Sequence, residues 1–139
     1  VLKACVQHQL LPANLLPSKT ARTPLIGASV DLPERLMSQP SSLAQYGTEA
    51  QWVQGLLGHD KEILPGLSEA MVRFAARYEY ARTGEDVLAR RSRWLFLDAQ
   101  QAAQAADRVA AILKEEGISA PQEEEFLLKT KQYSGANLL

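Results

Sequence analysis

Two stretches of the chain place their apolar residues at steps of three and four, a spacing that lines them up on one face of an α-helix. The first predicts a helix over about 67–81, with a face of Leu67, Ala70, Met71, Phe74, Ala75, Tyr78 and Ala81. The second predicts a helix over about 98–116, with a face of Ala102, Ala106, Val109 and Leu113. Asp98 is a suitable start and Gly117 a suitable end for this second helix. We expect the two faces to pack against each other.

Shorter helices are predicted by pairs in which a Ser or Thr precedes a Gln or Asp by three residues, as in a capping box. These pairs are Ser42 with Gln45, Thr48 with Gln51, Thr83 with Asp86, and Ser119 with Gln122. We expect Gly58 to end the helix that begins near Thr48. The helix predicted from Ser119 carries glutamates 123–125 in its first turn, where they complement the helix dipole. The glycine-containing stretch 55–66 is interpreted as a helix end followed by a turn.

The first 40 residues differ from the rest, because they contain five of the seven prolines. Proline removes a backbone donor and favours extended chain before it. We therefore predict a short helix over about 1–9 and then an irregular arm, with a separate helical domain over 41–139. An irregular stretch of this length is unusual inside a self-contained domain. Together with a start at Val1 instead of a methionine, it leads us to expect a piece of a longer protein, whose missing part the arm contacts.

Composition favours the same fold class. Alanine and leucine supply 41 residues, whereas Val, Ile and Thr supply only 16, so helix formers outnumber strand formers. The prediction is an all-α fold, a compact bundle of five to six helices with an irregular proline-containing N-terminal arm. No apolar run is long enough to span a membrane. The single cysteine, Cys5, excludes an intrachain disulfide.

Common catalytic and ligand-binding motifs do not emerge from the residues. Cys5 and His8 lie one helical turn apart, but a structural zinc site needs four ligands and His59 is the only other histidine. The glycines of 55–66 lack dinucleotide-binding or phosphate-loop spacing, and the acidic stretch 115–125 lacks calcium-loop spacing. We predict no catalytic, cofactor-binding or metal-binding residue within this chain.

The densest chemistry lies in residues 73–93, which hold six of the nine arginines, three acids and no lysine. One interpretation is a phosphate or nucleic-acid surface, since guanidinium groups bind phosphate bidentately. The other is an ion-pair network that joins helices, because many of these charges lie three or four residues apart. The exclusive use of arginine and the overall charge of −1 favour the network. Its predicted members are Arg77, Glu79, Arg82, Asp86 and Arg90. Arg73, Arg91 and Arg93 are candidates for contact with another domain.

Residues 76–113, ARYEYARTGEDVLARRSRWLFLDAQQAAQAADRVAAIL, resemble the C-terminal helical domain of FAD-dependent glycerol-3-phosphate dehydrogenases and glycerophosphate oxidases. The matching positions are Arg77, Glu79, Ala81, Arg82, Thr83, Asp86, Arg90, Arg91, Arg93, Phe96, Leu97 and Asp98, with the upstream pair Tyr46 and Gly47. Departures from the family pattern are Arg73, Tyr78, Gly84 and Ser92. The specific part covers about 40 residues, and weaker similarity extends over about 40–133.

The resemblance implies a parent enzyme, an oxidoreductase that oxidises sn-glycerol 3-phosphate to dihydroxyacetone phosphate. FAD would accept the hydride and pass electrons to quinone, or to oxygen in the oxidases. The flavin and substrate domains would belong to a missing N-terminal part, which would be the partner of this chain. The chain alone would be a non-catalytic accessory domain that does not bind nucleic acid.

The resemblance also implies a cytoplasmic parent, peripherally associated with the inner face of the cell membrane. It leaves open whether the parent forms a homo-oligomer. The rival interpretation is a stand-alone helical module that binds nucleic acid or protein through residues 73–93.

Overall fold

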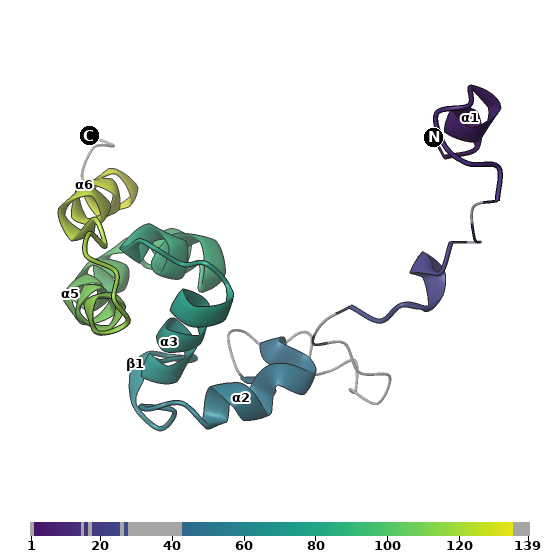
Figure 1. Cartoon of the computed structure of the whole chain (residues 1–139). Helices are drawn as coiled ribbons and strands as arrows, with labels where there is room; N and C mark the ends of the chain where they lie inside the picture. The colour runs from purple at the N-terminus through teal and green to yellow at the C-terminus, as the bar shows by residue number, and fades with distance from the viewer. Residues whose placement is uncertain (1, 15, 17, 26, 28–42, 135–139) are drawn as a thin grey trace.

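The chain forms a helical body with a separate N-terminal arm (Figure 1). The computed structural model describes residues 2–14, 16, 18–25, 27 and 43–134. The body contains η3 (Leu43–Glu49), α2 (Ala50–Gln54), β1 (Glu62–Leu64), β2 (Leu67–Ser68), α3 (Glu69–Tyr78), η4 (Asp86–Arg91), α4 (Trp94–Leu97), α5 (Ala99–Glu115) and α6 (Glu123–Tyr133). The arm contains α1 (Leu2–Gln7) and η1 (Thr20–Arg22). The all-α fold class is therefore confirmed. No helix in the described ranges is long and apolar enough to cross a membrane.

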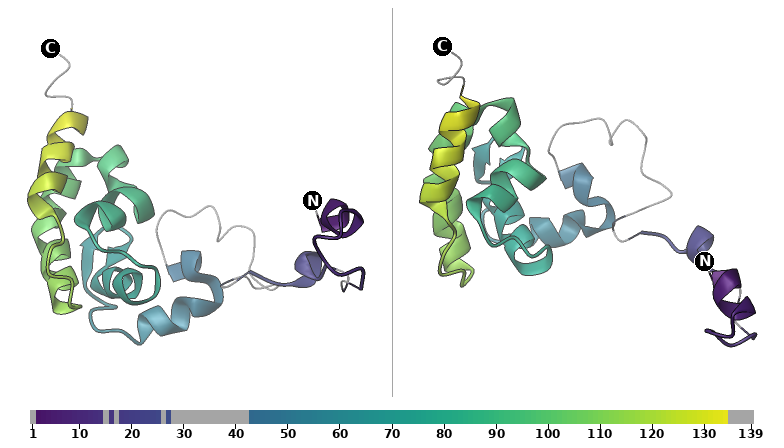
Figure 2. Two further views of the ribbon diagram at one scale, coloured as in Figure 1. Left: turned by 45° about the horizontal axis from the view of Figure 1, so that its top comes forward. Right: turned by 90° about the horizontal axis from the view of Figure 1, so that it is seen from above.

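The core lies where α3 and α5 meet, with α6 packed beside α5 (Figure 2). The predicted face of α5 is fully buried: Ala102, Ala106, Val109 and Leu113 are all at most 2% exposed. The predicted face of α3 is buried through Ala75. Tyr78, the next member of that face, is exposed instead, whereas Ala81, its last member, is buried although it follows the end of α3. Each large apolar side chain buried in this way contributes about 1.5–3 kcal/mol to folding. The two long helices are thus positioned by the faces that the sequence predicts.

A short β-hairpin precedes α3 and was not predicted from the sequence. β1 and β2 pair antiparallel, with Glu62 opposite Ser68 and Leu64 opposite Leu67. The turn between them uses Gly66, which has a φ of +77° that favours glycine. Ser68 then begins α3, because its side chain accepts a hydrogen bond from the Met71 N–H at 3.4 Å. Such short strands carry too few residues for a periodic signal.

The capping box predicted at Thr83 and Asp86 is present. The Thr83 hydroxyl accepts from the Asp86 N–H at 3.1 Å, and the Asp86 carboxylate accepts from the Thr83 N–H at 3.0 Å. The helical segment that follows, η4, is a π-helix. Its wider turn is closed by the Ser92 N–H, which donates to the Val87 carbonyl, five residues back, at 2.9 Å.

Other predicted helix ends are only partly correct. α2 begins after Glu49 without a side-chain cap from Thr48, and it ends before Gly58. α6 begins at Glu123 instead of near Ser119, although its first turn does hold the three expected glutamates. Gly117 follows the end of α5 with a φ of +85°, as predicted. The helix start predicted at Ser42 lies outside the described residues.

The arm, defined here as described residues 2–14, 16, 18–25 and 27, extends away from the body in every view (Figures 1 and 2). It is attached at Gly27, whose carbonyl accepts a hydrogen bond from the Thr48 N–H at 3.0 Å. The backbones meet closely there: a Cβ on Gly47 would lie 1.7 Å from the Gly27 carbonyl oxygen. Gly47 also has φ 52° and ψ −122°, a conformation that suits only glycine. The proposed division into 1–40 and 41–139 stays a prediction.

We predict that Gly47→Ala lowers the free energy of unfolding by about 1–3 kcal/mol, because alanine meets both the Gly27 carbonyl and an unfavourable backbone conformation. Urea denaturation followed by circular dichroism measures the change. Gly55→Ala is the matched control, since a Cβ there has its nearest neighbour at 3.5 Å and φ is −75°. The control variant should be neutral or stabilised by up to about 1 kcal/mol. Equal stability of the two variants would contradict the close approach.

Candidate functional site

The centre of the charged network is Arg73, a buried arginine on α3. Its side chain is 5% exposed and lies against the C-terminal end of α5. One terminal nitrogen donates to Glu116 at 3.0 Å and the other to Glu115 at 2.5 Å. Glu69, one turn earlier on α3, lies 3.9 Å away. A buried guanidinium needs such partners, because an unpaired buried charge costs several kcal/mol.

Two further arginines close this cluster. Arg77, one turn after Arg73, binds Glu116 through two nitrogens at 2.5 and 2.8 Å. Arg108 on α5 binds Glu69 at 2.7 and 2.9 Å and reaches Glu115 at 3.5 Å. The α3–α5 cluster, namely Glu69, Arg73, Arg77, Arg108, Glu115 and Glu116, thus pairs three arginines with three glutamates and is formally neutral.

Contacts inside the α3–α5 cluster shift the pKa values of Arg73 and Glu116 in the direction that favours their charged forms. Burial lowers the pKa of Arg73, but hydrogen bonds to Glu115 and Glu116 outweigh burial and raise that pKa above its ordinary value. Hydrogen bonds from Arg77 and then Arg73 hold the pKa of Glu116 below its ordinary value, although burial opposes this. Arg73 and Glu116 therefore stay ionised near neutral pH, and their hydrogen bond joins α3 to the end of α5.

A second set of contacts connects the end of α3 to η4. Arg91 donates from Nε to the Glu79 carboxylate at 3.0 Å, and a terminal nitrogen donates to the Glu79 carbonyl oxygen. Its other terminal nitrogen donates to the Asp86 carbonyl at 3.0 Å. Arg91 is thus used to hold the corner between two helical segments. The sequence predicts Arg91 as a candidate interdomain contact, but its donors are turned toward its own domain.

Asp86 combines two roles through its two carboxylate oxygens. Oδ2 accepts from the backbone N–H groups of Arg82 and Thr83 at 2.9 and 3.0 Å, and Oδ1 accepts from Arg90 at 2.7 Å. Burial opposes ionisation, but these hydrogen bonds lower the pKa of Asp86 below its ordinary value. Glu85 beside it contacts Arg90 at 3.3 Å and also Lys129 on α6. This connects η4 to α6.

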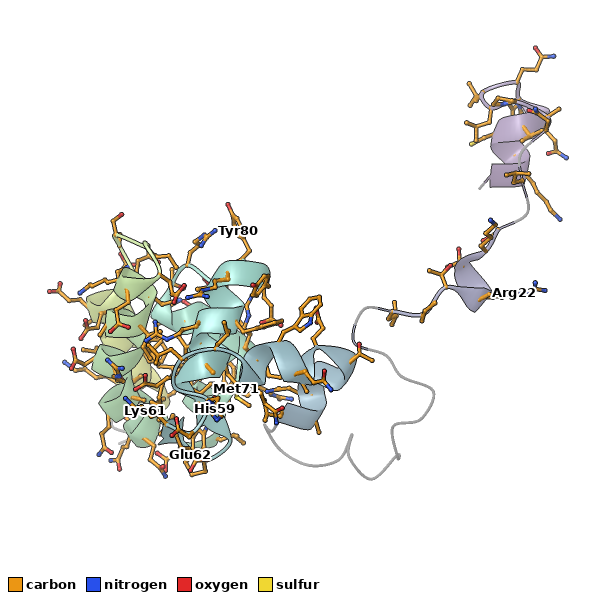
Figure 3. The ribbon with its side chains drawn as sticks, turned by 60° about the horizontal axis from the view of Figure 1, so that its bottom comes forward. Arg22, His59, Lys61, Glu62, Met71 and Tyr80 are labelled. Atoms are coloured by element: carbon orange, nitrogen blue, oxygen red, sulfur yellow. The ribbon has the colours of Figure 1, made fainter. Side chains whose placement is uncertain are left out.

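Arg82 takes different partners from those expected. Its spacing predicted pairing with Glu79, Glu85 or Asp86, but its side chain donates to the Ala76 carbonyl at 3.3 Å. The guanidinium also lies 4.4 Å from the centre of the Tyr80 ring, a cation–π contact. Tyr80 projects from the edge of the body (Figure 3). The reason is local: α3 ends at Tyr78 and Tyr80 has a φ of +60°, so helical spacing no longer applies.

The remaining interdomain candidates separate clearly. Arg73 is enclosed within the body, so its guanidinium has little surface to offer another domain. Arg93 is exposed, has a φ of +61°, and makes no side-chain ion pair within the described residues. The prediction of an interdomain contact stays a prediction, and Arg93 fits it best.

Several network members were missed by the sequence analysis. Glu115, Glu116 and Arg108 lie about forty positions from their partners on α3, and Lys129 lies similarly far from Glu85. Spacing rules find only partners within a turn or two of the same helix. The sequence does hold one signal for partners on α5. Arg73 and Arg77 lie one turn apart on α3, beside the face that packs on α5.

A small cavity of about 160 Å³ lies between η3, β2, α3 and η4. It is lined by apolar side chains that include Leu67, Met71 and Val87, and also by Tyr46, Glu79 and Arg91. The Tyr46 ring packs edge-on against the Phe74 ring, with 5.1 Å between the ring centres. Burial, and then the Glu79 charge, raise the pKa of Tyr46, so the phenol stays neutral. Three or more His, Cys, Asp or Glu side chains suited to a metal are not found together in the described part of the chain.

These observations describe a small helical domain in which most arginines of residues 73–93 bind groups of the same domain. Residues 18–119 match the family of the C-terminal domain of alpha-glycerophosphate oxidase, and the chain belongs to that family. A curated relative is the mitochondrial glycerol-3-phosphate dehydrogenase of Schizosaccharomyces pombe (strain 972 / ATCC 24843), 51% identical over 47 residues. The matched segment covers 34% of this chain and 7% of that protein. No solved structure matches the chain significantly.

We predict that Asp86→Ala costs about 1–2 kcal/mol of stability, the usual effect of losing a helix cap. Arg90→Ala is the matched control, because it removes the ion pair but leaves the cap; its side chain is 66% exposed. We expect it to cost less than about 0.5 kcal/mol. Chemical denaturation of both variants measures these changes. A loss for Arg90→Ala as large as that for Asp86→Ala would show that the ion pair, not the cap, stabilises η4.

The lowered pKa of Glu116 also predicts a pH dependence. Since folding lowers this pKa, the stabilisation is fully present above the unfolded value of about 4.3 and is lost as pH falls through the lower folded value. Glu116→Gln should therefore cost about 1–3 kcal/mol at neutral pH, and the cost should shrink in acid. Denaturation across pH measures it. Glu115→Gln is the control and should cost less, because the Glu115 side chain is half exposed. A difference between wild type and Glu116→Gln that does not change with pH would contradict this account.

Proposed function

We propose that this chain is the C-terminal accessory domain of a FAD-dependent oxidoreductase that converts sn-glycerol 3-phosphate to dihydroxyacetone phosphate. In this proposal FAD accepts the hydride and electrons pass on to quinone, with oxygen as the acceptor if the parent is an oxidase. The parent is cytoplasmic and peripherally associated with the inner face of the cell membrane.

The observation that carries the proposal is the family match over residues 18–119, together with the name of the relative. The 47 residues shared with that relative are 51% identical, which favours a common domain over a chance motif. The charged network gives a second line of support. Arg73, Arg77, Arg90 and Arg91 are engaged with carboxylates of the same domain, and phosphate would have to displace those partners.

In this proposal the flavin does not bind within the described residues. A cofactor site for a molecule of this size encloses about 300–1,000 Å³. The cavity lined by Tyr46 has about 160 Å³, and the larger hollow of about 400 Å³, lined by Arg82 and residues 116–120, is mostly open to solvent. Dinucleotide sites also place a glycine-rich turn between a strand and a helix. Here β1 instead leads into a hairpin. In this proposal FAD and substrate therefore bind in another part of the polypeptide, and this chain supplies no chemical step.

The role that remains is mechanical support. The α3–α5 cluster and the Asp86 contacts fix α3, η4, α5 and α6 relative to one another. A rigid domain of this kind can brace a flavin-binding body against which it packs. Arg93, exposed beside α4, is the side chain we assign to that contact.

The test is to express the complete reading frame that contains this chain. We expect a yellow protein whose flavin absorbance is bleached by sn-glycerol 3-phosphate and restored by a soluble quinone, and an upstream Gly-x-Gly-x-x-Gly motif after a strand. Glycerol and phosphate, added separately, are the matched control ligands. Absence of flavin would overturn the proposal. Salt-sensitive binding of nucleic acid by the 139-residue chain would favour the stand-alone module instead.

A further inference from the structure

The arm has a composition that the body does not share. Residues 1–27, which span the described arm, contain Lys3, Lys19 and Arg22 but no aspartate or glutamate, a formal charge of +3, and residues 1–40 together carry +2. Residues 41–139 contain eleven Lys and Arg against fourteen Asp and Glu, a formal charge of −3. The arm is therefore a local cationic segment in a chain that is nearly neutral overall.

The arm also exposes large apolar side chains. Leu10, Leu16 and Leu25 are 74–83% exposed. The hydrogen bonds of residues 2–25 in the described part join only near neighbours in the arm. Arg22 projects from η1 away from the body (Figure 3). Burial of each such leucine is favourable by about 1.5–3 kcal/mol of free energy. The arm therefore has the features of a segment that binds another surface.

We propose that the arm binds along an acidic groove on the flavin-binding part of the same polypeptide. Lys3, Lys19 and Arg22 pair with carboxylates of the groove, and Leu10, Leu16 and Leu25 enter apolar pockets along it. This inference rests on the proposed function, because it takes that part of the polypeptide as the partner.

Extended geometry favours a protein groove over a lipid surface. Helices that lie in a membrane interface carry one apolar face along their length, whereas α1 has six residues and prolines interrupt the chain after it. An extended backbone has free N–H and C=O groups, which a protein surface satisfies and lipid does not. Three cations add only about 1 kcal/mol each at an anionic membrane.

Two other partners are disfavoured on separate grounds. Single-stranded nucleic acid is held by stacking on aromatic side chains, and residues 1–40 contain no Phe, Trp or Tyr. The body of a second copy is acidic enough to attract the arm, but a groove on the same polypeptide is presented at an effective concentration of about millimolar. At ordinary protein concentrations, binding to the groove on the same polypeptide is therefore favoured over binding to a second copy.

The test compares amide hydrogen exchange of arm residues in the complete protein and in the 139-residue chain. We expect the arm to exchange at least about tenfold more slowly in the complete protein. The triple variant Lys3→Glu, Lys19→Glu, Arg22→Glu should lose this protection, and so should Leu10→Ser, Leu16→Ser, Leu25→Ser. The matched control reverses three exposed lysines of the body, Lys61→Glu, Lys114→Glu and Lys131→Glu, and should keep it. Salt should weaken protection in the wild type.

The outcomes separate this inference from the proposed function. Two results would overturn the inference alone, provided that the complete protein is a flavoprotein that oxidises sn-glycerol 3-phosphate. One is an arm without protection, and the other is an arm that stays protected in the variant Lys3→Glu, Lys19→Glu, Arg22→Glu. Protection that requires added phosphatidylglycerol vesicles would identify lipid as the partner and also overturn it. Protection that rises with protein concentration would do the same in favour of a second copy. A complete protein without flavin overturns both proposals.

Discussion

One buried cation aligns the two long helices of the body. Arg73 lies at the junction of α3 and α5 with almost no solvent around it, so its charge has to be balanced from within the protein. Glu115 and Glu116 approach from the end of α5 and Glu69 from α3 itself. This requirement fixes how far α5 extends along α3. Apolar faces alone would allow the helices to slide by a turn, whereas the directed hydrogen bonds of a guanidinium define one register.

Farther from Arg73, other charged groups are also held by directed hydrogen bonds, but they are less buried. Asp86 uses one carboxylate oxygen for the backbone and the other for Arg90, and Arg91 spans the corner to Glu79. These outer pairs are partly hydrated and contribute less energy than Arg73 and its partners. Their value is geometric: they order a corner where α3 has ended and η4 has begun. Residues 73–93 resemble a phosphate-binding surface by composition, but most of their arginines bind groups within the same domain.

The sequence was sufficient for the parts of the fold governed by local rules. The faces of α3 and α5, the Thr83–Asp86 box and the end at Gly117 follow from periodicity and capping, which depend on neighbours within one or two turns. The hairpin was missed because its strands are two and three residues long. Arg82 was assigned wrong partners because the backbone leaves the helix at Tyr80. Arg73 is a candidate for an interdomain contact by sequence because its partners on α5 are distant along the chain. Long-range pairing of charges depends on how the helices pack, so spacing rules within one helix do not identify the partners.

The π-helical geometry of η4 has a consequence for how homologous sequences are compared. A π turn is related to an α turn by the insertion of one residue, and removing that residue would rotate everything after it by about 100° relative to what precedes it. Arg91 comes at the end of this turn and would then swing away from Glu79. Alignments of this segment should therefore be ungapped between Asp86 and Ser92, and a homologue shortened by one position there would have to close its corner with a different side chain.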